Sequence, residues 1–442
     1  MRQVRRLIGA SVALLVCGCA HIPWANDPSA EPPKVCAAQT PAPYAESLYC
    51  RGLYGAAAAS FAENLSGENP HATRADRVTA LRWLVYIYRR FPGWDWIVDV
   101  IGQTDWPELD RPELADVRDD LLLLAARFEY GHERFEETVA LLATIPESSP
   151  LHARAALLAG AVHVRTGAQD LAQAAFAEAL RAASADSDPK RARDRDLAAL
   201  SLARAHYAMQ EYALASRYYE SIPLTSPYGF AAAVESGRAR LQMNDIPPAL
   251  ALVESIKKRS REAPPETMAE ALLVEAEISL QKRRKWETVG VTRQFHEVYT
   301  ALYQPMRRLK DYGPDALFDL AFSIRSGGLL PPLGTEQTKQ TLHLLTDGPV
   351  ARRFAELDEL AREVASLVPP GRGVALDQAG VALTDRQKAV AQEAGELLQR
   401  RVEDLVPRMV GQIKEAIGIE YVALHSGSEV DDGQLTGAEA LE

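Results

Sequence analysis

Cysteine is scarce in this chain of 442 residues. There are only four, Cys17, Cys19, Cys36 and Cys50, and none occurs after residue 50. The rest of the chain therefore holds neither a thiolate metal site nor a cysteine nucleophile. Aromatic residues make up only 7%, whereas alanine, leucine and arginine are abundant. Because these three are good helix formers, the composition predicts an all-α fold.

Catalytic and cofactor motifs are also lacking. The nine histidines are scattered singly, with no H-E-x-x-H, no Cys-His cluster and no pair at i and i+4. There is no G-x-S-x-G, no P-loop and no G-x-G-x-x-G. We therefore expect no catalytic residue, metal, cofactor or small-molecule substrate. A net charge of −11 argues against a general nucleic-acid binder.

The N-terminus reads as an export signal. Arg2, Arg5 and Arg6 precede an apolar stretch, residues 7–16, which is too short to cross a bilayer as a helix. The following Val-Cys-Gly-Cys resembles the bacterial lipobox, which implies cleavage after Gly18 and acylation of Cys19. Ala20 replaces the aspartate typical of inner-membrane retention, so we expect an outer-membrane anchor. The alternative is a secretory signal without lipid.

Removal of the signal peptide, residues 1–18, takes away three arginines and lowers the net charge from −11 to −14. Two thiols then remain for pairing, and in an oxidising compartment we predict a Cys36–Cys50 disulfide. The alternative is two free thiols. Residues 19–43 contain six prolines and little apolar periodicity, so they predict a Pro-rich tether and not a folded domain.

The body of the chain, residues 44–310, shows short amphipathic helices in pairs. One segment matches the tetratricopeptide (TPR) spacing with Gly160, His163, Gly167, Ala172, Phe176 and Ala179. Gly160 would let the first helix approach the second, and Phe176 would fill the seam between them. The turn position recurs at Phe135, Gln169, Tyr212, Ile246 and Trp286, with spacings of 34, 43, 34 and 40 residues. This pattern predicts a TPR-like right-handed helical solenoid.

The C-terminal third departs from the repeat. We predict a helical transition segment with Pro/Gly linkers at 311–373 and a C-terminal helical extension at 374–425, with a long helix from about Thr384 to His425. Residues 426–442 hold five acids and no base, which predicts a disordered acidic tail. The pattern does not decide whether the long helix caps the solenoid or pairs with another chain.

The first helices of the repeats offer a binding surface. The same repeat position is arginine in three units, and an aromatic or apolar side chain follows three residues later. Together with one further arginine they predict a partner-binding groove for an acidic segment: Arg127, Tyr130, Arg165, Arg204, Tyr207, Arg238 and Leu241. Equally, these arginines could pair with acids of neighbouring helices.

Two longer stretches, residues 218–306 and 389–424, carry a family resemblance. Together with the lipobox, their order and spacing resemble the tetratricopeptide outer-membrane lipoproteins of deltaproteobacteria, which include the lipoprotein of the myxobacterial gliding machinery. The resemblance implies a non-enzymatic scaffold, anchored in the outer membrane and facing the periplasm, that binds protein partners of a trans-envelope complex. Its alternatives are an accessory lipoprotein of outer-membrane β-barrel assembly and a helical protein acting on peptidoglycan. The oligomeric state is left open.

Overall fold

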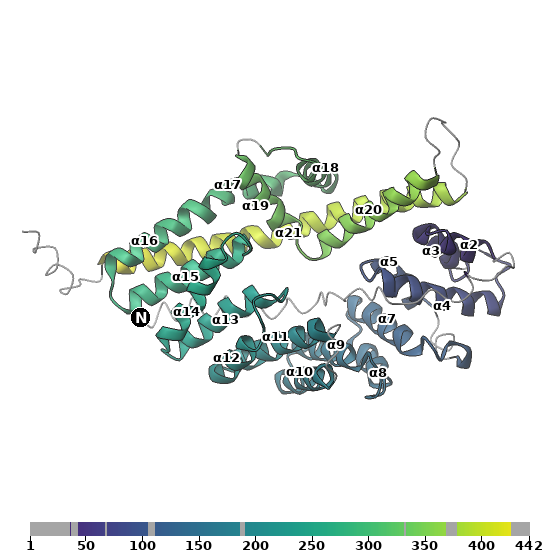
Figure 1. Ribbon diagram of the computed structural model, residues 1–442, viewed down its shortest axis with the longest axis horizontal. Coiled ribbons are helices and arrows are strands. Elements are labelled where there is room, and N and C mark those ends of the chain that lie inside the picture. Colours follow the sequence, from purple (N-terminus) through teal and green to yellow (C-terminus); the bar gives the residue numbers. More distant parts are fainter. Residues whose placement is uncertain are drawn as a thin grey trace, which may run out of the picture. The chain divides into compact units, whose positions relative to one another are not determined.

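The computed structural model describes residues 36, 43–66, 69–104, 111–185, 191–330, 333–367 and 378–425, and these residues form helices and no strand (Figure 1). The predicted signal peptide, the acylation site Cys19, most of the Pro-rich tether and the acidic tail lie outside the described residues. Within the described part, no helix is long and apolar enough to cross a bilayer.

The helices follow one another with short connections. They are α2 (Tyr44–Cys50), α3 (Tyr54–Glu63), α4 (Arg74–Arg90), α5 (Asp95–Gly102), η3 (Pro112–Leu114), α7 (Arg118–Gly131), α8 (Phe135–Ala143), α9 (His152–Arg165), α10 (Gln169–Ser184), α11 (Ala192–Ala208), α12 (Tyr212–Glu220), α13 (Gly229–Gln242), α14 (Ile246–Lys258), α15 (Pro265–Gln281), α16 (Lys285–Phe295), the π-helical η5 (His296–Thr300), α17 (Ala301–Arg308), η6 (Leu309–Asp311), α18 (Pro314–Arg325), α19 (Thr335–Leu345), α20 (Pro349–Leu367) and α21 (Gln378–His425).

Two compact units divide the described chain. The N-terminal unit holds residues up to 198 together with 348–394, and the C-terminal unit holds 199–347 together with 395–425. Helices α11 and α21 each contribute residues to both units. Each unit is therefore completed by a segment from the C-terminal part of the chain.

Six helical hairpins of the described residues turn in the same way. The first joins α2 to α3, where Gly52 has a φ of 81° and Leu53 donates its backbone N–H to the carbonyl of Leu48 at 2.9 Å. The other five follow the same rule. In each of these five, a residue with φ between 56° and 76° lies two positions before the second helix: Glu133, Gly167, Gln210, Asn244 and Arg283. The next residue donates its backbone N–H to the carbonyl five positions earlier, at 2.8–3.0 Å. This is a Schellman-type helix end, which stops the first helix and starts the second in a fixed direction.

The second helices of the last five hairpins begin at residues 135, 169, 212, 246 and 285, so their spacings are 34, 43, 34 and 39. The first four positions agree with the sequence prediction. The fifth position is wrong by one residue, because the turn at Arg283 starts helix α16 at Lys285 and not at Trp286. Trp286 is accordingly 60% exposed and does not fill a turn.

The hairpin of α9 and α10 explains why one repeat position must be small. A Cβ atom on Gly160 would lie 2.3 Å from Cε1 of Phe176, whose ring is buried between the two helices. Ala172, one turn before Phe176, is also fully buried. The predicted contact of Gly160 with the second helix is therefore confirmed, and its cause is steric.

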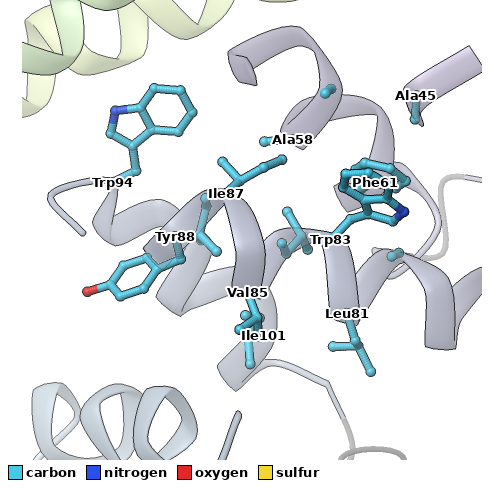
Figure 2. Close-up of a cluster of buried hydrophobic side chains, with 14 of the residues drawn as sticks. Ala45, Ala58, Phe61, Leu81, Trp83, Val85, Ile87, Tyr88, Trp94 and Ile101 are labelled. Carbon is cyan, nitrogen blue, oxygen red and sulfur yellow. The ribbon is translucent and has the colours of Figure 1, made fainter. Parts of the chain in front are cut away.

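The core of the N-terminal unit is rich in aromatic residues. Phe61 stacks on Trp83 with ring centroids 5.7 Å apart, and both lie among buried aliphatic residues of α3, α4 and α5 (Figure 2). Leu360 of α20 and Val390 of α21 belong to the same cluster. Leu360 lies in the predicted transition segment and Val390 in the predicted C-terminal extension, so parts of both segments that sequence reading left apart from the repeats belong to this core.

Glu363 connects α20 to the start of α3 through hydrogen bonds. Its carboxylate accepts the backbone N–H groups of Gly55 at 2.9 and 3.0 Å and of Ala56 at 3.4 Å. These are donors of a first helical turn, which have no partner inside the helix. Burial raises the pKa of Glu363 to about 7, although the N–H groups favour its charged form.

The predicted disulfide is present. Cys36 and Cys50 are joined, with their Cα atoms 5.4 Å apart and 14 positions apart in sequence. Cys50 is the last residue of α2, so the bond attaches the N-terminal segment to the first helical hairpin. A cross-link over a loop of this length stabilises a fold by roughly 3 kcal/mol in the chain-entropy description.

Helix α21 begins at Gln378, six residues before the predicted Thr384, and runs to His425. Its C-terminal half buries side chains at steps of four and three residues in alternation: Leu398, Val402, Leu405, Met409, Gln412, Ala416, Ile419 and Ala423. Val406 is buried in addition to this series. This alternation is the heptad spacing of a helix that packs along other helices. Gln412 is the one polar member of the stripe.

Candidate protein-binding face

The first helices of the C-terminal unit carry the predicted arginines on a connected polar surface. Arg204 of α11 donates from Nε and Nη2 to Glu235 of α13, at 2.9 and 2.6 Å. Both side chains are largely buried, so this is a two-pronged ion pair shielded from solvent. Arg204 thus links two consecutive first helices.

Arg238, one turn after Glu235 on α13, is buried close to several carboxyl groups. It is 9% exposed, and its nearest charged partner is Glu415 of α21, at 3.6 Å from Nη1 to Oε1. Burial opposes its charge, but the carboxylates of Glu415, Glu270 and Glu277 outweigh this effect and raise the pKa of Arg238. The one guanidinium of Arg238 therefore interacts electrostatically with several carboxyl groups.

Three acids of α15 have raised pKa values. Burial raises the pKa of Glu277 to about 7, and Arg238 only partly offsets that effect. Burial also raises the pKa of Glu270 and of Glu266, despite the nearby Arg238 and Arg401 respectively. The face of α15 that carries these residues therefore holds more buried carboxyl groups than its cations can neutralise.

The C-terminal half of α21 covers this face. Arg401 donates from Nη2 to Glu266 at 2.6 Å and from Nε to the carbonyl of Leu344 at 2.9 Å. Gln412 reaches Glu270 at 3.5 Å. Figure 1 shows this part of α21, in yellow, running alongside α15. The surface that Arg238 occupies is thus closed by the chain's own helix.

Three buried polar atoms at this contact have no hydrogen-bond partner: Nε of Arg238, the hydroxyl oxygen of Tyr299 and Oε1 of Gln412. Tyr299 lies in the π-helical η5 and is fully buried, and burial raises its pKa. A buried polar group left unbonded costs about 1–3 kcal/mol. The contact between α21 and the helices beneath it is therefore incompletely satisfied.

The N-terminal unit places Arg127 in a different setting. Its guanidinium binds Asp95 at 3.1 Å and the hydroxyl of Tyr88. Asp95 is also bound by Arg353 of α20, at 2.9 Å. Arg353 is 2% exposed and donates further to Glu356 at 2.8 Å, to Glu393 at 3.1 Å and to the carbonyl of Gly93.

Arg386 of α21 closes this network. It donates to Glu356 at 3.0 Å and to Glu393 at 2.9 Å, and its guanidinium lies 5.0 Å from the ring centre of Trp96. We call Arg127, Arg353, Arg386, Asp95, Glu356 and Glu393 the Arg353 network. It joins α5, α7, α20 and the first part of α21 within the N-terminal unit.

The arginines of the predicted groove are thus paired with acids of the chain itself, which is the alternative that the sequence left open. Arg127, Arg204 and Arg238 pair with acids of other helices, and Arg165 binds Glu133 of the preceding turn at 2.5 Å. Tyr130, Tyr207 and Leu241 are buried. Burial raises the pKa of Tyr207 to about 12. A groove that these seven residues present to a partner stays a prediction.

Sequence reading missed Arg353, Glu356 and the acids on α15, because most of their partners lie far away along the chain: Asp95 is 258 positions from Arg353, and Arg401 is 135 positions from Glu266. The heptad stripe of α21 was a readable signal of a docked helix, but the stripe does not name the surface it docks on. Within the described residues, no group of three or more histidine, cysteine or acidic side chains is arranged to hold a metal ion. No protein-family model matches the chain, and neither does any curated protein.

Proposed function

We propose that this chain is a non-enzymatic scaffold that binds protein partners through a tetratricopeptide-type solenoid. It is anchored in the outer membrane by acylated Cys19 and faces the periplasm, where it holds components of a trans-envelope complex such as a gliding machine. The proposal joins the lipobox and repeat spacing of the sequence to the hairpins of the fold.

The observation that carries the scaffold proposal is the recurrence of one hairpin turn. Six times within the described residues the chain places a left-handed residue two positions before a second helix, and the last five of these helices start 34 residues apart in two intervals and further apart in two others. Repeated helical hairpins expose a series of first helices, and the side chains of those helices provide extended surfaces for peptides and helices. Here those helices carry Arg127, Arg204 and Arg238, each of which is paired with an acid of another helix of the chain.

The test is crosslinking in the native cells, followed by detergent solubilisation, affinity purification and mass spectrometry. Recovery of several inner-membrane and periplasmic proteins of one machine is the expected result. Recovery of a large outer-membrane barrel as the main partner would replace the trans-envelope complex with barrel assembly. Glycan turnover by the purified protein would contradict the scaffold proposal.

The anchor has its own test with a matched control. Intact-mass analysis of the mature protein should show acyl addition, and Cys19→Ser should abolish it and release the protein from the membrane fraction. Cys17→Ser is the control, because it changes a neighbouring thiol that the signal peptidase removes, and it should leave acylation in place. An unacylated mature wild-type protein would refute the outer-membrane assignment.

A further inference from the structure

The contact between α21 and the C-terminal unit has the form of a helix in a groove. Residues 395–425 bury a heptad stripe, and polar side chains beside the stripe reach α13, α15 and α19. This is how amphipathic helices are recognised by other proteins, with apolar anchors on one face and charged residues that set the register. The chain therefore supplies its own helix to a surface shaped for one.

The fit of that helix is imperfect. Arg238 meets Glu415 at 3.6 Å, longer than the 2.6–2.9 Å of the Arg204–Glu235 pair one turn away. The Nε atom of Arg238, the Tyr299 hydroxyl and Oε1 of Gln412 are buried without a partner. A different helix with better-placed polar groups could satisfy Nε of Arg238 and the hydroxyl of Tyr299, and displacement of α21 would return Oε1 of Gln412 to solvent, so the resident helix is open to competition.

We propose that the face of α13 and α15 beneath residues 395–425 is the binding site for an amphipathic helix of a protein partner, which displaces this half of α21. The proposal rests on the scaffold function proposed above and specifies its partner. The occupant carries apolar residues in a heptad, a carboxylate opposite Arg238, and a cation opposite Glu266 and Glu270. Displacement frees Arg238 from its cover.

A trans-peptide experiment tests this site without knowledge of the natural partner. The probe is a fluorescent synthetic peptide with the sequence of residues 395–425, and its affinity for the full mature chain is measured by anisotropy. Because the resident helix occupies the site, the apparent affinity is reduced by the fraction of chains in which the site is open. Weakening the resident helix should therefore strengthen binding of the peptide.

Glu415→Lys is the variant for this purpose, since it places a cation against Arg238. We expect the wild-type peptide to bind this variant about tenfold or more tightly than it binds the wild-type chain. Glu403→Lys is the matched control: it makes the same charge change on the exposed side of the same helix and should leave the affinity unchanged. Equal affinity for all three chains, with unchanged circular dichroism, would overturn the proposal.

A charge swap checks the register. A peptide carrying Glu415→Lys should bind an Arg238→Glu chain better than the wild-type peptide does. Hydrogen exchange on the wild-type chain keeps the test decisive if a variant fails to fold. Residues 395–425 should exchange faster than α15, and exchange of both only through global unfolding would refute displacement. These results do not depend on the affinity purification, so an empty pull-down with a positive peptide result would count against the envelope partner alone.

Discussion

Two buried arginines, Arg353 and Arg238, bind the C-terminal helices of this chain in different ways. Arg353 of the N-terminal unit binds three carboxylates and a backbone carbonyl within hydrogen-bonding distance. Arg238 of the C-terminal unit has one ion pair at 3.6 Å and an unbonded Nε, although three carboxyl groups influence it. A fully bonded buried charge is strongly held, whereas a partly bonded one leaves a helix replaceable.

The same helix takes part in both settings. Residues 378–394 of α21 belong to the Arg353 network through Arg386 and Glu393, and residues 395–425 cover Arg238. The first part therefore acts as a fixed piece of the N-terminal unit. The second part is the piece that we expect to exchange with partners. The predictions below test this contrast, starting with the largest effect.

The largest expected effect is that of Arg353→Ala. It leaves Glu356, whose side chain is fully buried, with Arg386 as its remaining partner, and should lower the free energy of unfolding of the N-terminal unit by about 3–5 kcal/mol. Arg238→Ala should cost less, about 1–2 kcal/mol, because the carboxyls of Glu270 and Glu277 can take up protons. Fragment-resolved hydrogen exchange measures both.

The control for these two variants is Arg362→Ala, since the Arg362 side chain is 71% exposed and should contribute almost nothing. Equal losses for Arg353→Ala and Arg238→Ala would break the contrast between the two settings.

The next effect is pH dependence. The folded-state pKa of Glu277 is about 7, above its ordinary value of 4.5, so the folded state holds this proton more tightly. The stability of the C-terminal unit should therefore fall by roughly 2–3 kcal/mol as pH rises from about 4.5 through 7. Glu277→Gln should reduce the pH dependence of stability in the C-terminal unit, and Glu363→Gln should reduce it in the N-terminal unit.

The exposed Glu254→Gln serves as the matched change for the pH experiment and should leave both profiles as they are. A wild-type profile that rises with pH over the same interval would show that the carboxyl of Glu277 is ionised in the folded protein.

A smaller effect of opposite sign in the two units is expected from a pair of tyrosines. Tyr299→Phe removes a buried hydroxyl without a partner and should raise the stability of the C-terminal unit by about 1 kcal/mol. Tyr88→Phe removes a hydroxyl that Arg127 binds and should lower the stability of the N-terminal unit by a similar amount. Urea unfolding measures both changes in stability. Changes of the same sign in the two variants would contradict the contrast between the two units.

The smallest effects should be similar in size in the two units and follow the direction of the substitution, because they come from local backbone geometry. Gln210→Gly should raise stability by about 0.5–1 kcal/mol, since glycine adopts positive φ without strain. Gly167→Ala should lower it by about 1 kcal/mol for the same reason. Thermal unfolding measures both, and a loss on Gln210→Gly would show that its side chain matters more than its φ.

Local features were predictable from sequence and distant pairings were not. The hairpin turns and the contact of Gly160 with Phe176 depend on residues within one repeat, so spacing alone locates them. The arginines were placed on first helices, but the partner of Arg238 lies on α21, and no short-range pattern names Glu415. The stripe of α21 predicts a buried helix equally well whether it docks on its own chain or on another.

The disulfide between Cys36 and Cys50 also determines how mechanical load would enter the protein. A pull applied upstream of Cys36 passes through the sulfur bridge to the end of α2, so the force bypasses α2 itself. The force then reaches the α2–α3 hairpin at its turn, the point beside Glu363 where the late helix α20 is attached. Reduction would reroute the same pull through the first turn of α2, from which a helix unravels.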